Sequence, residues 1–190
     1  DLSASLVQAS EPVAVFSGVE TTAAPSGVID VPPAPGWTSG DTCCLDHLED
    51  QMFPIESVGM HYVITRSPIR STGSYHEPDI IRFVGVAEAA TVTTNLPPPF
   101  DSFTLQPGEV KTTWTQTDIV ATATKPVTIG QILVSNQYVD GTYIGDPSLT
   151  VFPPVEQFRT QYVFLTPGSW TQDWVVIAAK CVVLAAGGAA

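Results

Sequence analysis

A dense polar cluster, Asp46-His47-Leu48-Glu49-Asp50, stands beside Cys43 and Cys44 and contains the residue types that bind zinc or calcium. Finger-type zinc sites need Cys-x-x-Cys and His-x₃₋₅-His pairs, and an EF-hand needs carboxylates at alternate positions around a central Gly. Neither spacing occurs here, and the run from Asp140 to Asp146, with its Asp-Gly and Gly-Asp pairs, is more typical of a turn than of a calcium loop. We therefore predict no metal site and no cofactor.

Nucleophilic catalysis needs a Ser or Cys near a His and an acid, often in a Gly-x-Ser-x-Gly turn. That motif is missing, and the histidines are His47, His61 and His76. His61 is better explained as a hydrogen-bonding strand residue, and Glu56 and Glu156 recur at equivalent places, which favours a structural role in a turn. We predict no catalytic residues and no enzymatic activity, with a hydrolase built on the polar cluster as the least favoured alternative.

Three cysteines allow at most one disulfide within the chain. Cys43 and Cys44 are adjacent, so the candidate pairing joins one of them to Cys181. The alternative is three buried thiols that act as small hydrophobic side chains.

Four tryptophans could pack in the core or form a surface on which sugars stack. Trp170 and Trp174, near a Pro-Gly turn, are the best candidates for an exposed pair. They are the predicted binding residues if the protein is a carbohydrate- or protein-binding module.

Charge narrows the possible partners. The 190 residues carry 7 Lys+Arg against 19 Asp+Glu, a formal net charge of −12, and the cations are scattered. A chain without a basic stripe does not suit a phosphate backbone or an anionic membrane surface. No apolar run reaches the roughly 18 to 20 residues that cross a bilayer. We expect no nucleic-acid partner, no membrane insertion, and a secreted, extracellular or cell-surface protein, a setting that three cysteines and few charges also suit.

The composition predicts an all-β fold. Seventeen Pro and 14 Gly interrupt a chain that is rich in Val and Thr, which leaves little room for long helices. Short turns between strands favour an antiparallel β-sandwich or jelly roll, with a β-propeller fragment as the alternative. One short helix is predicted near residues 43–53, because Leu45, Leu48 and Met52 would share one face and Pro54 would end it.

Alternation and β-branched runs predict the strands. The predicted strands are Pro12–Phe16, Tyr62–Arg66, Ile80–Val86, Thr91–Thr94, Ser102–Leu105, Val110–Gln116, Asp118–Thr122, Val127–Ser135, Gln161–Leu165, Trp174–Ala178 and Cys181–Leu184.

Two pairs of segments are weakly similar, which suggests an internal duplication. Residues 6–15 resemble residues 120–129, and residues 46–63 resemble residues 146–163. The second pair is identical at Asp46/Asp146, Pro54/Pro154, Glu56/Glu156, Tyr62/Tyr162 and Val63/Val163. We predict a first β module over residues 1–100, with a Pro/Gly-rich insertion at 24–42, and a related second module over 101–190 that lacks its C-terminal end.

Three motifs together resemble a known family. They are Pro12-Val13-Ala14-Val15-Phe16-Ser17-Gly18, Asp46-His47-Leu48-Glu49-Asp50-Gln51-Met52-Phe53-Pro54, and Gly145-Asp146-Pro147-Ser148-Leu149-Thr150-Val151-Phe152-Pro153-Pro154-Val155-Glu156-Gln157-Phe158. This combination is similar to the amino-terminal domain of IgG Fc-binding protein and its bacterial surface relatives. The resemblance implies a secreted or surface domain of a large protein, linked to mucus, adhesion or extracellular matrix. Where that family often carries a Cys after the Phe-Ser-Gly segment, this chain has Val19-Glu20-Thr21-Thr22.

We expect an extracellular structural or adhesive β-domain that acts by contact with other protein chains. A strand edge left open in such a domain can pair with another chain, so self-assembly into a surface or filamentous structure is a natural consequence. The alternative is a carbohydrate- or protein-binding module that uses Trp170 and Trp174, with a glycan as a possible ligand.

Overall fold

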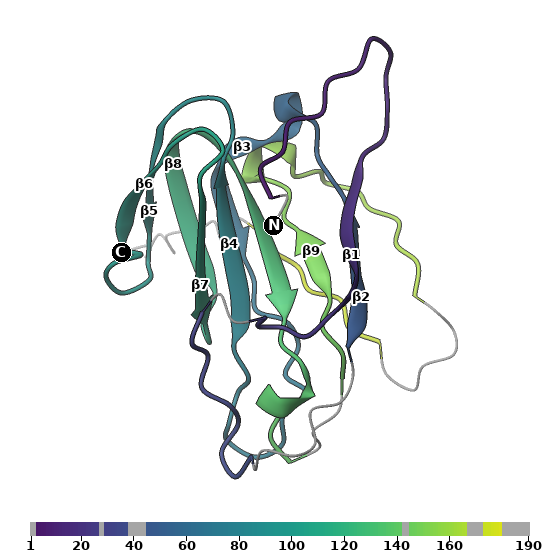
Figure 1. Cartoon of the computed structure of the whole chain (residues 1–190), viewed down its shortest axis with the longest axis vertical. Coiled ribbons are helices and arrows are strands. Elements are labelled where there is room, and N and C mark those ends of the chain that lie inside the picture. Colours follow the sequence, from purple (N-terminus) through teal and green to yellow (C-terminus); the bar gives the residue numbers. More distant parts are fainter. Residues whose placement is uncertain (1–2, 27–28, 38–44, 142–144, 167–172, 180–190) are drawn as a thin grey trace, which may run out of the picture.

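The computed structural model describes residues 3–26, 29–37, 45–141, 145–166 and 173–179. In these ranges every regular element is a strand or a short 3₁₀ helix, which confirms the predicted all-β class. A seven-stranded antiparallel sheet stands beside a two-stranded ribbon (Figure 1). No helix in the described ranges is long and apolar enough to cross a membrane.

The ribbon comprises β1 (Phe16–Thr22) and β2 (Asp46–Gln51). The sheet comprises β3 (Gly59–Ile64), β4 (Asp79–Gly85), β5 (Ala90–Thr94), β6 (Ser102–Leu105), β7 (Val110–Thr115), β8 (Ile119–Leu133) and β9 (Leu149–Val151). The 3₁₀ helices are η1 (Ile55–Ser57), η2 (Asn136–Tyr138) and η3 (Val155–Gln157).

Strand β8 organises the sheet. Its residues 119–123 pair with β3 and β5, its residues 127–133 pair with β4 and β9, and Val127 also pairs with Gly59 at the start of β3. β6 extends the first half beyond β5, and β7 extends the second half beyond β4. The sequence predicts two strands here, Asp118–Thr122 and Val127–Ser135, separated by a turn at Lys125 and Pro126. The chain instead continues through Lys125 and Pro126 and links the two halves.

The core lies between these halves. One apolar cluster takes residues from both, including Tyr62 of β3, Phe83 of β4 and Val92 of β5, each no more than 1% exposed. The rings of Phe83 and Phe103 meet edge to face with centroids 5.1 Å apart. Since β8 belongs to the predicted second module while β3, β4 and β5 belong to the first, the two predicted modules share one sheet. The module boundaries stay a prediction.

The helix predicted near residues 43–53 is wrong over its described part, which contains strand β2. Apolar residues at Leu45, Leu48 and Met52 suit one face of a helix, yet only Leu48 of the strand is buried. The backbone of this segment pairs instead with β1, from Phe16 opposite Gln51 to Val19 opposite Leu48. A partner 30 residues away therefore outweighed the local spacing.

Other predicted strands differ at the chain ends. β1 begins at Phe16, where the strand expected at Pro12–Phe16 was to end. The expected strands Gln161–Leu165 and Trp174–Ala178 belong to no strand of the structure, and Cys181–Leu184 lies outside the described residues. The described parts of the insertion at 24–42 contain no strand, and Ala24, Val31 and Ala34 are buried there.

Candidate interaction surface

The β1–β2 ribbon depends on a close backbone approach. A Cβ atom on Gly18 would lie 2.2 Å from the carbonyl oxygen of Leu48, so only glycine lets the two strands come this close. At the end of the ribbon, Met52 N donates to Val15 O over 2.8 Å. A two-stranded ribbon is marginally stable by itself, so contacts beyond its own ladder must support it.

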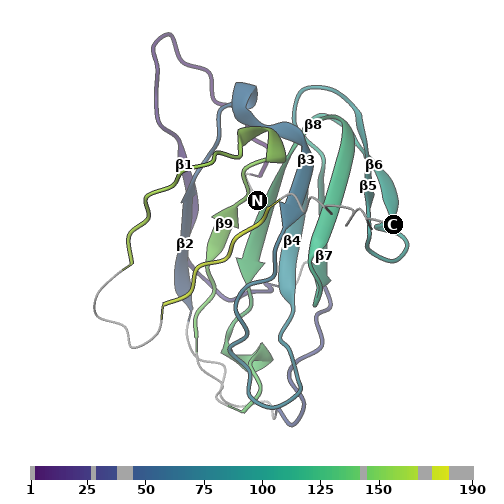
Figure 2. The same ribbon diagram turned by 180° about the vertical axis from the view of Figure 1, so that it is seen from behind.

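One such contact joins the ribbon to the sheet. Asp50 of β2 accepts a hydrogen bond over 2.7 Å from Val151 N of β9, and both views show these strands side by side (Figures 1 and 2). The same carboxylate accepts from Gln51 N. Asp50 therefore holds two backbones, its own strand and β9.

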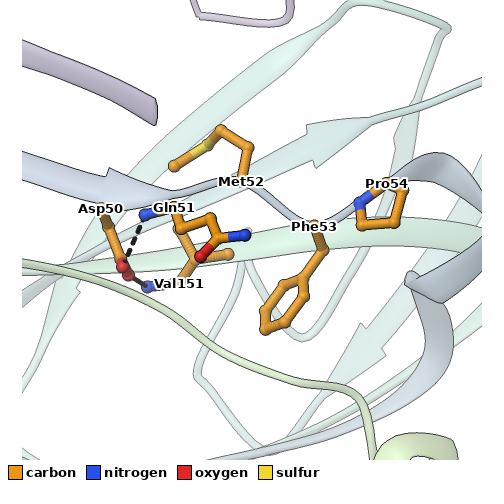
Figure 3. Close-up of a pocket in the computed structure, with 6 residues that line it drawn as sticks. All are labelled: Asp50, Gln51, Met52, Phe53, Pro54 and Val151. Atoms are coloured by element: carbon orange, nitrogen blue, oxygen red, sulfur yellow. Dashed lines mark hydrogen bonds between the residues drawn. The ribbon is translucent and has the colours of Figure 1, made fainter. Parts of the chain in front are cut away.

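A shallow pocket of about 290 Å³ lies at this junction (Figure 3). Its lining is Asp50, Gln51, Met52, Phe53, Pro54 and Val151. The only titratable group in that lining is Asp50, already hydrogen-bonded to two backbone nitrogens. Met52, Phe53, Pro54 and Val151 make most of the lining apolar, as is common in binding pockets.

The ribbon has exposed apolar side chains on both faces. All of β1 except half-buried Thr22 is exposed, including Phe16 at 60% and Val19 at 44%, and Leu45, just before β2, is 61% exposed. Side chains alternate along a strand, so Val19, opposite buried Leu48, lies on the face toward the sheet, and Phe16, opposite Gln51, lies on the other face. We call the face that carries Phe16 the ribbon face. Exposed aromatic side chains are common at protein-binding surfaces.

The ribbon also has an open edge. Backbone groups of an antiparallel strand point alternately toward the partner and away from it. Because Val15 O receives the bond from Met52 N, the groups of Ser17 and Val19 face β2, while those of Phe16 and Gly18 face outward. Within the described residues β1 pairs with no strand except β2. This edge contains no Lys and no Pro, the residues that usually protect an edge from pairing.

A second exposed apolar stretch follows η3, where the chain leaves the sheet in an extended run (Figure 2). Tyr162, Val163, Phe164 and Leu165 are 67% to 102% exposed. Further on, Trp174, Val175, Val176 and Ile177 are 50% to 80% exposed. Both stretches have the composition of core strands but lie outside the described sheet.

Acidic groups surround the ribbon. No Lys or Arg occurs before Arg66, whereas Glu20, Asp46 and Glu49 are on the ribbon and exposed. A positively charged segment is therefore the natural complement of this side of the molecule.

The predicted polar cluster lies on β2 and is spread over both sides of the strand. His47 Nε2 lies 2.8 Å from Glu49 Oε2, and Asp46 accepts from the backbone N–H of His47. Among the described residues no group of three His, Cys, Asp or Glu side chains could hold a metal ion. The Asp140 to Asp146 loop is described in part, and there Thr72 N donates to Asp140 O.

η3 is tied to β3 through Glu156. Its Oε1 accepts from Met60 N over 3.0 Å and lies 2.8 Å from His61 Nδ1. Partial burial would raise the pKa of Glu156, but the hydrogen bonds from His61 and Met60 outweigh this and hold it below its ordinary value. His61 is thus a hydrogen-bonding strand residue, as expected, and Glu156 holds a turn.

Two buried carboxylates were not singled out from the sequence. Asp79 and Glu77 are 2% and 4% exposed. Burial raises the pKa of Asp79 even though Ser67 donates to it, whereas hydrogen bonds from Ser71 and Arg70 lower the pKa of Glu77 against the effect of burial. The sequence signal for these buried carboxylates was the position of two acidic residues at the start of the apolar strand Asp79–Gly85. They fasten the loop of residues 65–78 through hydrogen bonds from its backbone.

The predicted binding and disulfide residues are only partly described. Trp174 is 69% exposed, in line with a surface position, while Trp170 lies outside the described residues. Cys43, Cys44 and Cys181 also lie outside them, so the disulfide stays a prediction. The ribbon face and the open edge of β1 were missed, because a helix was expected where β2 forms.

The comparisons with known proteins agree with the motif resemblance. The family model described as IgGFc binding protein matches residues 1–185. No curated protein and no solved structure gives a match. Since the family model covers nearly the whole sequence, the chain belongs to the IgGFc binding protein family.

Proposed function

We propose that this chain is an extracellular, non-catalytic domain that binds other protein chains, as a structural or adhesive part of a larger surface or filamentous assembly. The observation that carries the proposal is the ribbon, which combines exposed apolar side chains with an open strand edge. Family membership supports it, because the family is named for binding an immunoglobulin fragment.

The contacts at the ribbon favour binding over catalysis. Asp50, the carboxylate of the pocket, holds the backbones of Gln51 and Val151. Exposed Phe16 and Val19 offer apolar area that a partner chain would bury at about 25 cal/mol per Å². The backbone groups of Phe16 and Gly18 add hydrogen-bonding capacity that an extended segment of a partner would satisfy.

Carbohydrate binding is the second candidate, because Trp174 is 69% exposed and could stack on a sugar ring. The two candidates differ in which side chain matters. Protein binding depends on the ribbon face, whereas glycan binding depends on Trp174 and its predicted companion Trp170.

Surface plasmon resonance with the full chain immobilised tests the proposal. The probes are IgG Fc and a mucin glycoprotein, each before and after enzymatic removal of its glycans. Protein binding predicts that at least one probe is retained after deglycosylation, that Phe16→Asp weakens retention at least tenfold, and that Trp174→Ala leaves it unchanged. Ile69→Asp, at a 43% exposed apolar residue away from the ribbon, is the matched control. Loss of all retention on deglycosylation, or on Trp174→Ala alone, would contradict the proposal.

A further inference from the structure

We propose that residues 159–165 of one copy of this chain add as a strand to the open edge of β1 in a second copy. The inference rests on the proposed function and names one partner of the same surface: another copy of the chain. It is argued from the donor segment, the acceptor edge and the charges that each carries.

The donor segment has a buried counterpart within the same chain. Pro54 and Pro154 each precede a 3₁₀ helix, and their carbonyl oxygens accept from Ser57 N and Gln157 N over 2.9 and 2.8 Å. Five residues later the backbones of Gly59 and Arg159 donate to the hydroxyl oxygens of Tyr62 and Tyr162. These parallels support the predicted local duplication.

The two counterparts differ in what covers them. Tyr62 lies within β3, which pairs with residues 119–122 and 127 of β8, and Tyr62 and Ile64 are each 1% exposed. The equivalent residues Tyr162 and Phe164 are 68% and 67% exposed, and Val163 between them is 102% exposed. The second segment thus has the sequence of a sheet strand, but in the described structure it pairs with no strand and is exposed.

The acceptor edge offers what that segment needs. The outward backbone groups of Phe16 and Gly18 would pair with alternate residues of an added strand. The side chains of Phe16 and Val19 would cover its apolar positions. The regular ladder with β2 covers residues 16–19, after which the register shifts before Thr22. A short added strand is therefore sufficient.

Local charge favours a second copy as the occupant. The acceptor side has exposed Glu20 and no Lys or Arg before Arg66. The donor contains Arg159 and no acidic residue from 157 to 172. The Arg159 guanidinium donates to Phe158 O and Gln157 Oε1, both in its own turn, so the cation is available to a carboxylate.

One antiparallel register satisfies both the charge pairing and the apolar pairing of the two strands. Placing Arg159 opposite Glu20 also places Val163 opposite Phe16, an aromatic and β-branched pair that stabilises neighbouring strands. The overall charge of −12 on each copy opposes association, and at about 0.15 M ionic strength screening over roughly 8 Å weakens that repulsion while the contact remains.

The geometry of such a contact is head to tail. Donor and acceptor are different surfaces of the same chain, so each copy can give one strand and accept another. Repetition produces a closed ring or an open filament.

Sedimentation velocity of the full chain, from about 1 to 200 μM at 0.15 M salt, tests the inference. The wild type is expected to shift from monomer to larger species with concentration. Val163→Pro should remain monomeric, because proline removes a ladder N–H. Val163 is fully exposed, so the variant should fold normally, and an unchanged urea midpoint checks this. Val175→Pro, at an exposed residue of the other extended stretch, is the matched control and should associate as the wild type does.

A charge reversal tests the register. Glu20→Arg and Arg159→Glu should each weaken association about three- to tenfold, and the double variant should restore it. Glu11→Arg, which changes another exposed acid of the cation-free region, should have no comparable effect. A wild type that stays monomeric, a Val163→Pro protein that still associates, or a double reversal without recovery would overturn the inference. If the wild type stays monomeric but still retains protein probes in the surface plasmon resonance assay, the proposed function stands and the partner is a different chain.

Discussion

The Glu156 carboxylate lies 2.8 Å from Nδ1 of His61, so that η3 is joined to strand β3 across 95 residues of sequence. Met60 N donates to the same oxygen over 3.0 Å. This clamp fixes the point from which the exposed run of residues 159–165 departs.

Glu156→Gln removes the negative charge that accepts the hydrogen bonds of the clamp and should reduce the free energy of unfolding near pH 7 by about 0.5–1 kcal/mol, the scale of a net hydrogen-bond contribution. Because the pKa of Glu156 is lower in the folded state, its contribution is complete above the unfolded value and is lost as pH falls through the folded value. Urea unfolding from pH 7 to pH 3 should show the two proteins converging below about pH 4.3. Glu56→Gln, at the matching exposed position of η1, is the control. A constant difference across this pH range would contradict the account.

Gly59→Ala tests the contact between the two similar segments. A Cβ atom at Gly59 would lie 2.5 Å from Cβ of Pro154 and 2.7 Å from Oε2 of Glu156. Because the Pro154 ring cannot rotate away, we expect a loss of about 1–3 kcal/mol in the free energy of unfolding. Gly130→Ala is the matched control, since its nearest neighbour, Cδ1 of Leu149, lies at an ordinary 3.7 Å. Equal stability of the two variants would show that the segments do not pack as described.

Tyr62→Phe compares a buried hydroxyl with its exposed counterpart. The Tyr62 hydroxyl donates to Val127 O over 2.6 Å and accepts from Gly59 N over 3.2 Å. Its removal should cost about 1–3 kcal/mol, because the buried backbone groups lose their partner. Tyr162→Phe, which removes a hydroxyl from a 68% exposed side chain, should cost less than about 0.5 kcal/mol. Similar losses in thermal or urea unfolding would contradict the assignment of one segment to the core and the other to the surface.

Alkaline pH gives a second readout of Tyr62. Burial raises the pKa of Tyr62 to about 12. A folded-state pKa above the unfolded value of about 10 means that the contribution is complete below about pH 10 and is lost between about pH 10 and 12. Tyr62→Phe should therefore lose less stability than the wild type over this range.

The strands of the sheet could be predicted because alternation and burial agree there. Ser102–Leu105 was predicted with the observed bounds of β6, and Thr91–Thr94 misses β5 by one residue at its start. In these strands every second side chain enters the core, so local sequence and tertiary packing favour the same structure.

The ribbon could not be predicted in the same way. Leu45, Leu48 and Met52 have helical spacing, and the strand observed between Asp46 and Gln51 exists because β1 supplies a partner through the close approach at Gly18. The exposed run at Tyr162 shows the reverse case. Its sequence is typical of a strand, and the described structure contains no strand beside it. In both cases the decisive factor is a pairing partner distant in sequence.

The most direct test of the central claim, that the protein acts by contacts at the β1 edge and the run of residues 161–165, is amide hydrogen–deuterium exchange at several protein concentrations. If these surfaces join two copies, the amides of Phe16 and Gly18 and those of the alternate donor residues Gln161, Val163 and Leu165 become protected together as concentration rises, while the amides of β4 stay protected throughout. If both surfaces exchange rapidly at every concentration, or only one of them gains protection, the contact described here does not form.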